Sequence, residues 1–259
     1  QDKFSNNVLP LRVGNDVATI DRAMRVIEIL SSRREYTKLN PLVVLLGKGD
    51  HEVSSSCAGP YGTEYATTLA ITRSNVTFLG QGIGETTILG GFCIEFQENI
   101  TLKQLTLTNS HEQEGALGGG GISMDGAKVE LVDVATVHCH SFGISARDTT
   151  TAPSQLVATR CEMSNNGGIG LMVYMPNAHS LGIHIRLKNC ISHHNEIGIW
   201  VARKGVMHVY GDDTAIHSNR SFGIFANDSA KVVIHLPSHH NTYYNNGRQN
   251  RYAVDGGTI

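Results

Sequence analysis

The sequence predicts one all-β domain, a single-stranded right-handed parallel β-helix of about seven or eight coils with an α-helical cap at its N-terminal end. Three observations lead to this prediction. A Gly-Ile signature recurs every 22 to 30 residues, and the segments between alternate apolar and polar residues as half-buried strands do. One early segment has its apolar residues at helical spacing instead. We expect residues 1–40 to form the N-terminal segment and capping helix, and residues 41–259 to form the β-helix.

The repeat is clearest in the middle and late parts of the chain. Successive spacings are 22, 25, 30 and 25 residues when counted between Ile122, Ile144, Ile169, Ile199 and Ile224. Runs rich in Val, Ile and Thr alternate within each unit and end at Gly, Asn and Ser turns. A unit this short cannot bury its own apolar face, so the units must stack to form a continuous core.

The two ends of the predicted coil stack differ. The segment "NDVATIDRAMRVIEIL" is predicted to form a helix, with Asn15 or Asp16 as its N-cap. One face of this helix carries the apolar side chains Val17, Ile20, Met24, Ile27 and Leu30. The run "PLVVLLGKG" then reads as the first buried strand. This helix would cover strand edges that otherwise invite aggregation. The C-terminal "GRQNRYAVDGGTI" has no comparable cap, so we expect that loops cover this end, that a protein partner does, or that the chain has been cut.

Composition and charge restrict the classes of function. The formal net charge is −2, which gives no reason to expect a nucleic-acid partner. No apolar stretch reaches the ~18 residues that a membrane span requires. The sequence leaves extracellular and intracellular locations equally open. Five dispersed cysteines without a CxxC pair argue against a zinc ribbon or a dense disulfide framework. Their pairing stays open, and we expect Cys161 and Cys190 to be small buried side chains.

A polar residue stands about three positions before Gly-Ile in each coil: His140, Asn166, Asn195 and, approximately, Asn219. Asparagine tolerates turn conformations and bonds to neighbouring backbone. Consecutive coils lie ~4.8 Å apart, which suits a ladder of side-chain amides. We therefore assign these asparagines a structural role.

The residues after Gly-Ile provide the candidate ligand surface. If each isoleucine points inward, the next residue and the one two further on point outward. The first outward column is Ser123, Ser145, Gly170, Trp200 and Phe225, and the second is Asp125, Arg147, Met172, Ala202 and Asn227. Exposed aromatic faces beside polar groups suit sugar rings. The predicted substrate-binding residues are Trp200, Phe225, Asp125, Arg147 and Asn227. The alternatives are that loops cover both aromatics, or that a one-residue slip places them in the core.

Histidines occur at like positions in three coils, at His138, His193 and His217. We expect His193 and His217 to be neighbours, which makes them the weak candidates for a metal site. No metal and no cofactor is predicted, because one coil separates His138 from the other two.

The chain resembles the pectin-lyase-like superfamily, in particular its repetitive members with "GIxV…N..GI" coils, the NosD-type and F-box-associated carbohydrate-binding β-helices. The resemblance covers residues 41–250, and "LGQGIGETTILGG" at residues 79–91 looks like an early coil of that superfamily. It implies the β-helix fold and a role connected with carbohydrate.

Catalytic members of this superfamily include polysaccharide lyases and uronate epimerases, and their familiar catalytic motifs are absent from this sequence. Such enzymes need a group that neutralises the uronate carboxylate and a base that removes a proton. The best available polar residues are Asp125, Arg147, Tyr174, His184 and Arg203. The leading hypothesis is a β-helix that binds a polysaccharide along an exposed sheet, with its processing left open. The alternative is a non-catalytic scaffold for protein interaction.

Overall fold

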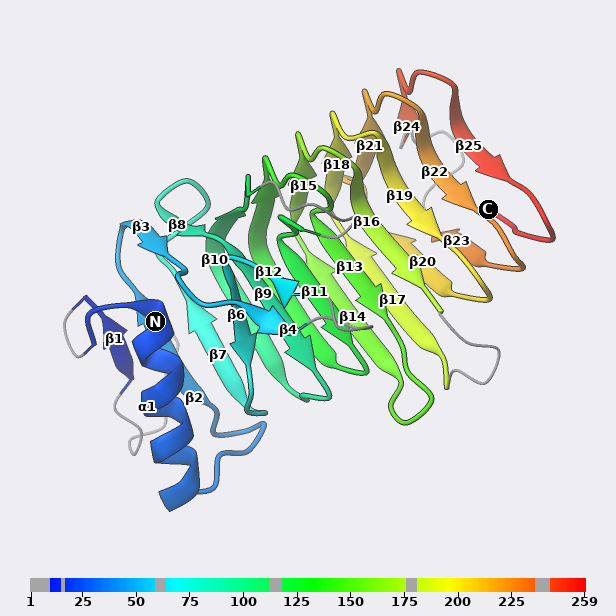
Figure 1. The fold of residues 1–259 in the computed structure, drawn as a ribbon. Coiled ribbons are helices and arrows are strands. Elements are labelled where there is room, and N and C mark those ends of the chain that lie inside the picture. Colours follow the sequence, from blue (N-terminus) through cyan, green and yellow to red (C-terminus); the bar gives the residue numbers. More distant parts are fainter. Residues whose placement is uncertain (1–9, 15–16, 59–63, 112–117, 176–180, 236–242) are drawn as a thin grey trace.

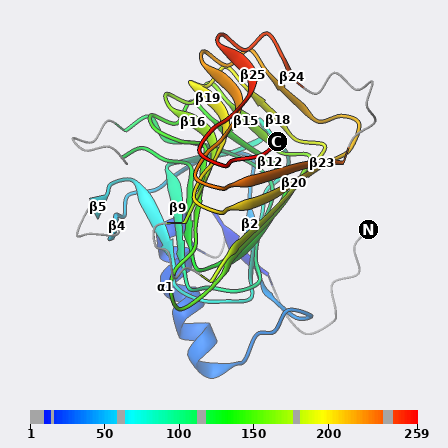
Figure 2. The same ribbon diagram turned by 90° about the vertical axis from the view of Figure 1, so that its right-hand side faces the viewer.

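A computed structural model describes residues 10–14, 17–58, 64–111, 118–175, 181–235 and 243–259. The chain coils into a right-handed parallel β-helix whose turns stack along one axis, as predicted (Figure 1). Seen along that axis, the strands surround a narrow interior (Figure 2). Buried apolar side chains from successive turns form one continuous core there. No helix in these residues is long and apolar enough to cross a membrane.

Eight strands from successive turns form the front sheet, which faces the viewer in Figure 1. Every neighbouring pair in it is parallel. Its members are β6 (Thr68–Ile71), β9 (Gly91–Glu95), β11 (Ile122–Asp125), β13 (Ile144–Arg147), β16 (Ile169–Tyr174), β19 (Ile197–Val201), β22 (Phe222–Ala226) and β25 (Gln249–Ala253).

The remaining parallel strands form one large sheet that bends around the other side. Its main path, here called the back sheet, is β1 (Leu11–Val13), β2 (Leu42–Leu46), β7 (Val76–Leu79), β10 (Ile100–Thr108), β12 (Lys128–Val137), β14 (Ser154–Thr159), β17 (Ile183–Lys188), β20 (Val206–Tyr210) and β23 (Lys231–His235). The side strands are β3 (Gly49–Glu52), β8 (Thr86–Leu89), β15 (Glu162–Ser164), β18 (Ile191–His193), β21 (Ala215–His217) and β24 (Tyr243–Tyr244). Strands β10 and β12 run through both parts.

The helix α1 (Ile20–Arg33) lies at the N-terminal end of the coil stack (Figure 1). It buries Ile20, Ala23, Met24 and Ile27 in the same core cluster as the strands. The N-cap is Thr19, whose hydroxyl accepts a 3.2 Å hydrogen bond from the backbone N–H of Arg22. The expected caps Asn15 and Asp16 lie outside the described residues, and the helix begins at Ile20, directly after Thr19.

The register of the front sheet corrects one coil of the sequence alignment. Ile144 pairs with Leu171 and not with Ile169, so β16 is shifted by two residues from the expected alignment. As a result Met172, and not Gly170, follows Ser145 in the first outward column, and Tyr174 follows Arg147 in the second. The alternation is interrupted at this glycine, because Ile169, expected inside, is partly exposed, whereas Gly170, expected outside, is buried and its Cβ direction points at Asn195 of the ladder. In this coil the expected faces of Ile169 and Gly170 were therefore wrong, as were the expected partners, whereas Met172 faces outward as expected.

The asparagine ladder is confirmed and extends further than expected. The side-chain amide of each member donates to Oδ1 of the next, from Asn166 to Asn195 at 3.0 Å, to Asn219 at 3.2 Å and to Asn246 at 2.9 Å. His140 is not a member. Cys139 takes the corresponding place, and its backbone N–H donates to Oδ1 of Asn166 at 3.0 Å.

The glycine of the Gly-Ile signature is explained by the same ladder. A Cβ on Gly198 would lie 2.7 Å from Nδ2 of Asn219 and 2.7 Å from the carbonyl oxygen of Gly223 in the next turn. Equivalent contacts surround Gly143, Gly170 and Gly223. Side chains are excluded here because the ladder and the neighbouring backbone already fill the space.

Candidate functional site

A row of polar side chains crosses the outer face of the front sheet. Glu95, Asp125, Arg147 and Tyr174 are direct neighbours on β9, β11, β13 and β16. Arg147 donates from Nε to Oδ1 of Asp125 at 2.7 Å and from Nη2 to Oδ2 at 2.6 Å. Their side chains are only 10% and 13% exposed, respectively. This bidentate geometry holds the two groups as one rigid unit.

Burial changes the protonation behaviour of this row. It raises the pKa of Asp125, and the positive charge of Arg147 offsets part of that effect. Burial, followed by the negative charge of Asp125, raises the pKa of Glu95. Burial alone would lower the pKa of Arg147, but Asp125 and the hydroxyl of Tyr65 outweigh it and raise that pKa. The guanidinium therefore stays charged, and most of its interactions are already satisfied.

A short antiparallel hairpin covers the N-terminal part of this face. Strands β4 (Cys57–Ala58) and β5 (Glu64–Tyr65) stand outside the coil stack (Figure 2). A disulfide joins Cys57 to Cys93 of β9, with the two Cα atoms 6.5 Å apart. The sequence left the cysteine pairing open, since 36 residues separate the two. The bond anchors the hairpin, whose Tyr65 is 4% exposed, beside Arg147.

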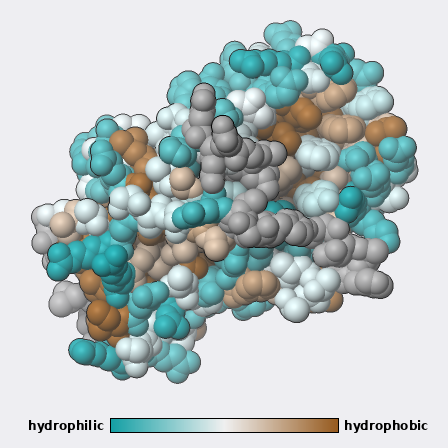
Figure 3. Space-filling model, viewed as in Figure 1, coloured by the Kyte–Doolittle hydropathy of each residue, from teal (hydrophilic) through white to brown (hydrophobic). Residues whose placement is uncertain are grey.

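The C-terminal part of the same face carries an aromatic platform, defined as Trp200, Phe222, Phe225 and Tyr252. The rings of Trp200 and Phe225 are 6.2 Å apart and tilted by only 11°. Tyr252 continues the stack at 5.5 Å from Phe225, and Phe222 lies 5.0 Å from Tyr252. All four side chains are partly exposed. Figure 3 shows apolar side chains at the surface over this end of the face.

The expected outward orientation of Trp200 and Phe225 follows from strand pairing. Trp200 pairs with Met172 on one side and with Phe225 on the other, while their inward neighbours Ile199 and Ile224 are fully buried. The indole Nε1 of Trp200 donates to Oδ1 of Asn227 at 2.7 Å. Asn227 was expected in the second outward column, and here it fixes the orientation of the indole.

Most of the polar candidates lie together, and one does not. Tyr174 lies 6.5 Å from Trp200 between ring centroids, and the guanidinium of Arg203 lies 4.9 Å from the Tyr174 ring. Tyr174 and Arg203 therefore connect the polar row to the platform. His184 is on β17, where it pairs with Gln155 and Val206 of the back sheet. It cannot act with the other candidates because it belongs to a different sheet.

The histidines form a stack rather than a ligand set. His193 and His217 are neighbours, as expected, with ring centroids 5.0 Å apart and planes within 2°. His193 also contacts Oε1 of Glu162 at 3.2 Å. His138 was misaligned. Its backbone φ is 55°, in the left-handed region, as is that of His194, so His138 corresponds to His194. The residue that corresponds to His193 is Val137, because Val137 pairs with Ser164 and Ser164 pairs with His193. Neither His193 nor His217 belongs to a group of three close ligand atoms among the described residues.

The candidate metal group that does occur in the described residues is Cys57, Cys93 and Glu95. The two sulfurs are joined in the disulfide and offer no thiolate. The remaining cysteines are unpaired and buried, as expected for Cys161 and Cys190. Burial raises the pKa of the third, Cys139, to about 12.

The stacked turns and the internal amide ladder define a parallel β-solenoid. The chain belongs to the right-handed β-helix family, whose model matches residues 66–246. The expected relationship to pectin-lyase-like β-helices is thus confirmed for the fold.

Two solved structures of Azotobacter vinelandii proteins are similar to the chain. One is the A-module of the mannuronan C-5 epimerase AlgE4, with 17% identity and a TM-score of 0.56 over 96% of this chain and 73% of that chain. The other is the A-module of the mannuronan C-5 epimerase AlgE6, with 16% identity and a TM-score of 0.54 over 85% of this chain and 66% of that chain. No curated protein matches the sequence.

Proposed function

We propose that the front sheet binds a polysaccharide, with sugar rings lying on the aromatic platform. The observation that carries this proposal is the near-parallel pair Trp200 and Phe225 on the outer face. Strands in a parallel sheet are ~4.8 Å apart, so the rings of adjacent turns form a continuous flat surface. Sugars offer C–H faces that pack on such rings and hydroxyl groups that bond to polar neighbours.

Polar groups around the platform complete this surface. Arg203 lies over Tyr174, and the guanidinium of Arg248 lies 5.9 Å from the Phe222 ring. Both arginines are exposed, so each places a guanidinium beside the platform, where sugar hydroxyls or carboxylates can reach it. The similar solved structures belong to enzymes that act on mannuronan, which supports a glycan over a protein as the ligand.

The geometry favours binding over chemistry. Asp125 occupies two donors of Arg147, and Tyr65 interacts with the same guanidinium. A uronate carboxylate would have to displace one of these groups before Arg147 could neutralise it. His184 lies on the other sheet, so the expected catalytic set is not assembled. The polar row is best explained as a rigid support next to the binding surface.

The test is retention of the protein in native gels that contain polysaccharides, for the wild type, Trp200→Ala and a matched control. Tyr244→Ala is the control because it removes a partly exposed aromatic that stacks on His217 on the side strands. We expect Trp200→Ala to weaken retention at least fivefold, since an aromatic contact contributes on the order of 1 kcal/mol. Tyr244→Ala should behave as the wild type.

Trp200 is the single tryptophan in the chain, so its fluorescence reports this face alone. A bound glycan should shift the emission and protect the indole from acrylamide. Equal retention of Trp200→Ala and wild type in every polysaccharide that retards the protein would refute the proposal. A large loss of thermal stability in Trp200→Ala would show that the ring supports the fold instead.

A further inference from the structure

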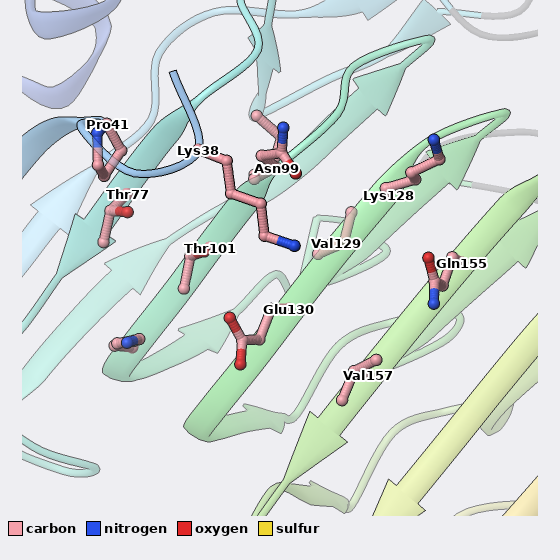
Figure 4. A pocket seen from close by; sticks show the side chains of 12 residues that line it. Lys38, Pro41, Thr77, Asn99, Thr101, Lys128, Val129, Glu130, Gln155 and Val157 are labelled. Atoms are coloured by element: carbon pink, nitrogen blue, oxygen red, sulfur yellow. The ribbon is translucent and has the colours of Figure 1, made fainter. Parts of the chain in front are cut away.

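A second surface lies on the back sheet, on the other side of the molecule from the aromatic platform. A groove of about 420 Å³ runs across β7, β10, β12 and β14, and the segment before β2 forms one of its walls. Lys38 extends from that wall over the strands, toward the side of the groove that carries Glu130 (Figure 4). The floor carries short polar side chains, including Thr101, Asn99 and Gln155.

Lysines dominate the charge of this groove. Lys38, Lys103 and Lys128 line it, with Glu130 as the acidic member of the lining. Lys128 forms an ion pair with Glu98. Lys38 and Lys103 form no ion pair with any residue that the structure describes. Two ammonium groups in the groove are therefore available to a ligand.

The cationic surface continues beyond the groove onto β17. Val157 pairs with Arg186, and Thr159 pairs with Lys188. Arg186 and Lys188 are exposed and also form no ion pair in the described part of the chain. Burial lowers the pKa of His208 on β20, and the positive charges of His235 and Arg186 lower it further. This is a local concentration of positive charge on a chain whose net charge is −2.

The spacing of these charges indicates the size of the ligand. Strands β10 and β17 are separated by three inter-strand steps, through β12 and β14, which is about 14 Å. Of the two intervening strands, β14 presents the uncharged side chains Gln155, Val157 and Thr159, and β12 presents one carboxylate, Glu130, in the row of Val157. A ligand that reaches both Lys103 and Lys188 must be an elongated chain with anionic groups at intervals, not a single small anion.

We propose that this cationic surface, defined by Lys38, Lys103, Arg186 and Lys188, is a second binding site, and that it takes an acidic polysaccharide bearing carboxylate groups. Hydroxyls and amides of the floor suit sugar hydroxyls between the charges. The groove lining has no aromatic ring on which a nucleic-acid base would stack, although the rings of His208 and Tyr210 adjoin Arg186 and Lys188 at the edge of the surface. It also lacks the buried aromatic anchors that dominate protein interfaces. This site is independent of the one proposed on the front sheet.

The test compares two variants with the same change of charge. Lys103→Gln/Arg186→Gln/Lys188→Gln removes three charges from the surface, and Arg22→Gln/Arg25→Gln/Arg33→Gln removes three from the exposed face of α1. Affinity for sodium polygalacturonate is measured by calorimetry at low and at physiological salt, with neutral dextran as the uncharged polymer. We expect the first variant to lose about tenfold in affinity at low salt, which corresponds to about 1.4 kcal/mol shared among three exposed charge contacts. The second should bind as the wild type.

Equal affinity of the two variants would overturn this proposal. So would equally tight binding of a 20-base-pair DNA duplex or of dextran sulfate, because the surface would then recognise dense negative charge in general. The fluorescence of Trp200 separates the two sites. The triple variant on the back sheet should keep the front-sheet response to glycan, whereas Trp200→Ala should keep the salt-dependent affinity for polygalacturonate.

Discussion

The indole nitrogen of Trp200 donates a 2.7 Å hydrogen bond to Oδ1 of Asn227, which lies 27 residues later in the next turn of the helix. The bond crosses between the two turns that carry the stacked rings of Trp200 and Phe225. The orientation of the Trp200 ring therefore depends on the register in which β19 and β22 pair, because that register places Asn227 beside the indole. Asn227 in turn donates from Nδ2 to Oδ2 of Asp228 at 3.0 Å, which fixes which amide atom faces the indole.

Removing this acceptor should loosen the platform without unfolding the protein. We expect Asn227→Ala to lower the free energy of unfolding by about 1 kcal/mol and to make Trp200 more accessible to acrylamide. In a Trp200→Phe background, which lacks the N–H, the same substitution should have much less effect. Thermal unfolding of the four proteins measures this coupling, and additive effects of the two substitutions would contradict it.

The amide ladder should be energetically uneven along its length. Asn195 is fully buried, donates to Met163, Ser192 and Asn219, and accepts twice from Asn166. Asn195→Ala leaves buried partners unsatisfied, so we expect a loss of about 3 kcal/mol. The matched control is Asn250→Ala at the exposed C-terminal end of the ladder, which should cost less than about 1 kcal/mol. Chemical denaturation decides the order, and a larger loss for Asn250→Ala would contradict it.

Glu95 should make the protein less stable as the pH rises. Its pKa in the fold lies above the ordinary value of 4.5 because of burial and the charge of Asp125. The folded state therefore binds the proton more tightly than the unfolded chain does, and stability falls as the pH rises from below 4.5 through the raised pKa. Glu95→Gln should raise the free energy of unfolding at pH 7 by less than about 1 kcal/mol, which is measured as a higher melting temperature. The substitution should have no effect near pH 3.

Glu85→Gln is the matched control for this prediction. The ammonium of Lys48 lowers the pKa of the exposed Glu85. Its charged form therefore favours the folded state, and the contribution is lost as the pH falls through the lowered pKa. The control should leave the melting temperature at pH 7 unchanged or slightly lower. A lower melting temperature for Glu95→Gln at pH 7 would show that the Glu95 carboxylate is stabilising.

The sequence by itself determined the fold and the outward orientation of Trp200 and Phe225 on the front sheet. Period-two alternation places Ile199 and Ile224 inside and Trp200 and Phe225 outside, and this does not depend on which residues pair between turns. The spacing of asparagines predicted the amide ladder, because each member repeats once per turn. The Gly-Ile signature was visible as a pattern, but its cause became clear only when the ladder and the backbone of the next turn surrounded Gly198.

Only the tertiary structure decided the register and the neighbours across turns. Turn lengths vary, so counting residues aligned Gly170 with Ser145 and His138 with His193, where the hydrogen-bonded strands place Met172 and Val137 in those rows. The Cys57–Cys93 bond and the Asp125–Arg147 pair join residues from different turns. The sequence assigns residues to a face because alternation is local. Which of them meet depends on how the turns stack, and stacking is set by contacts between residues more than 20 positions apart.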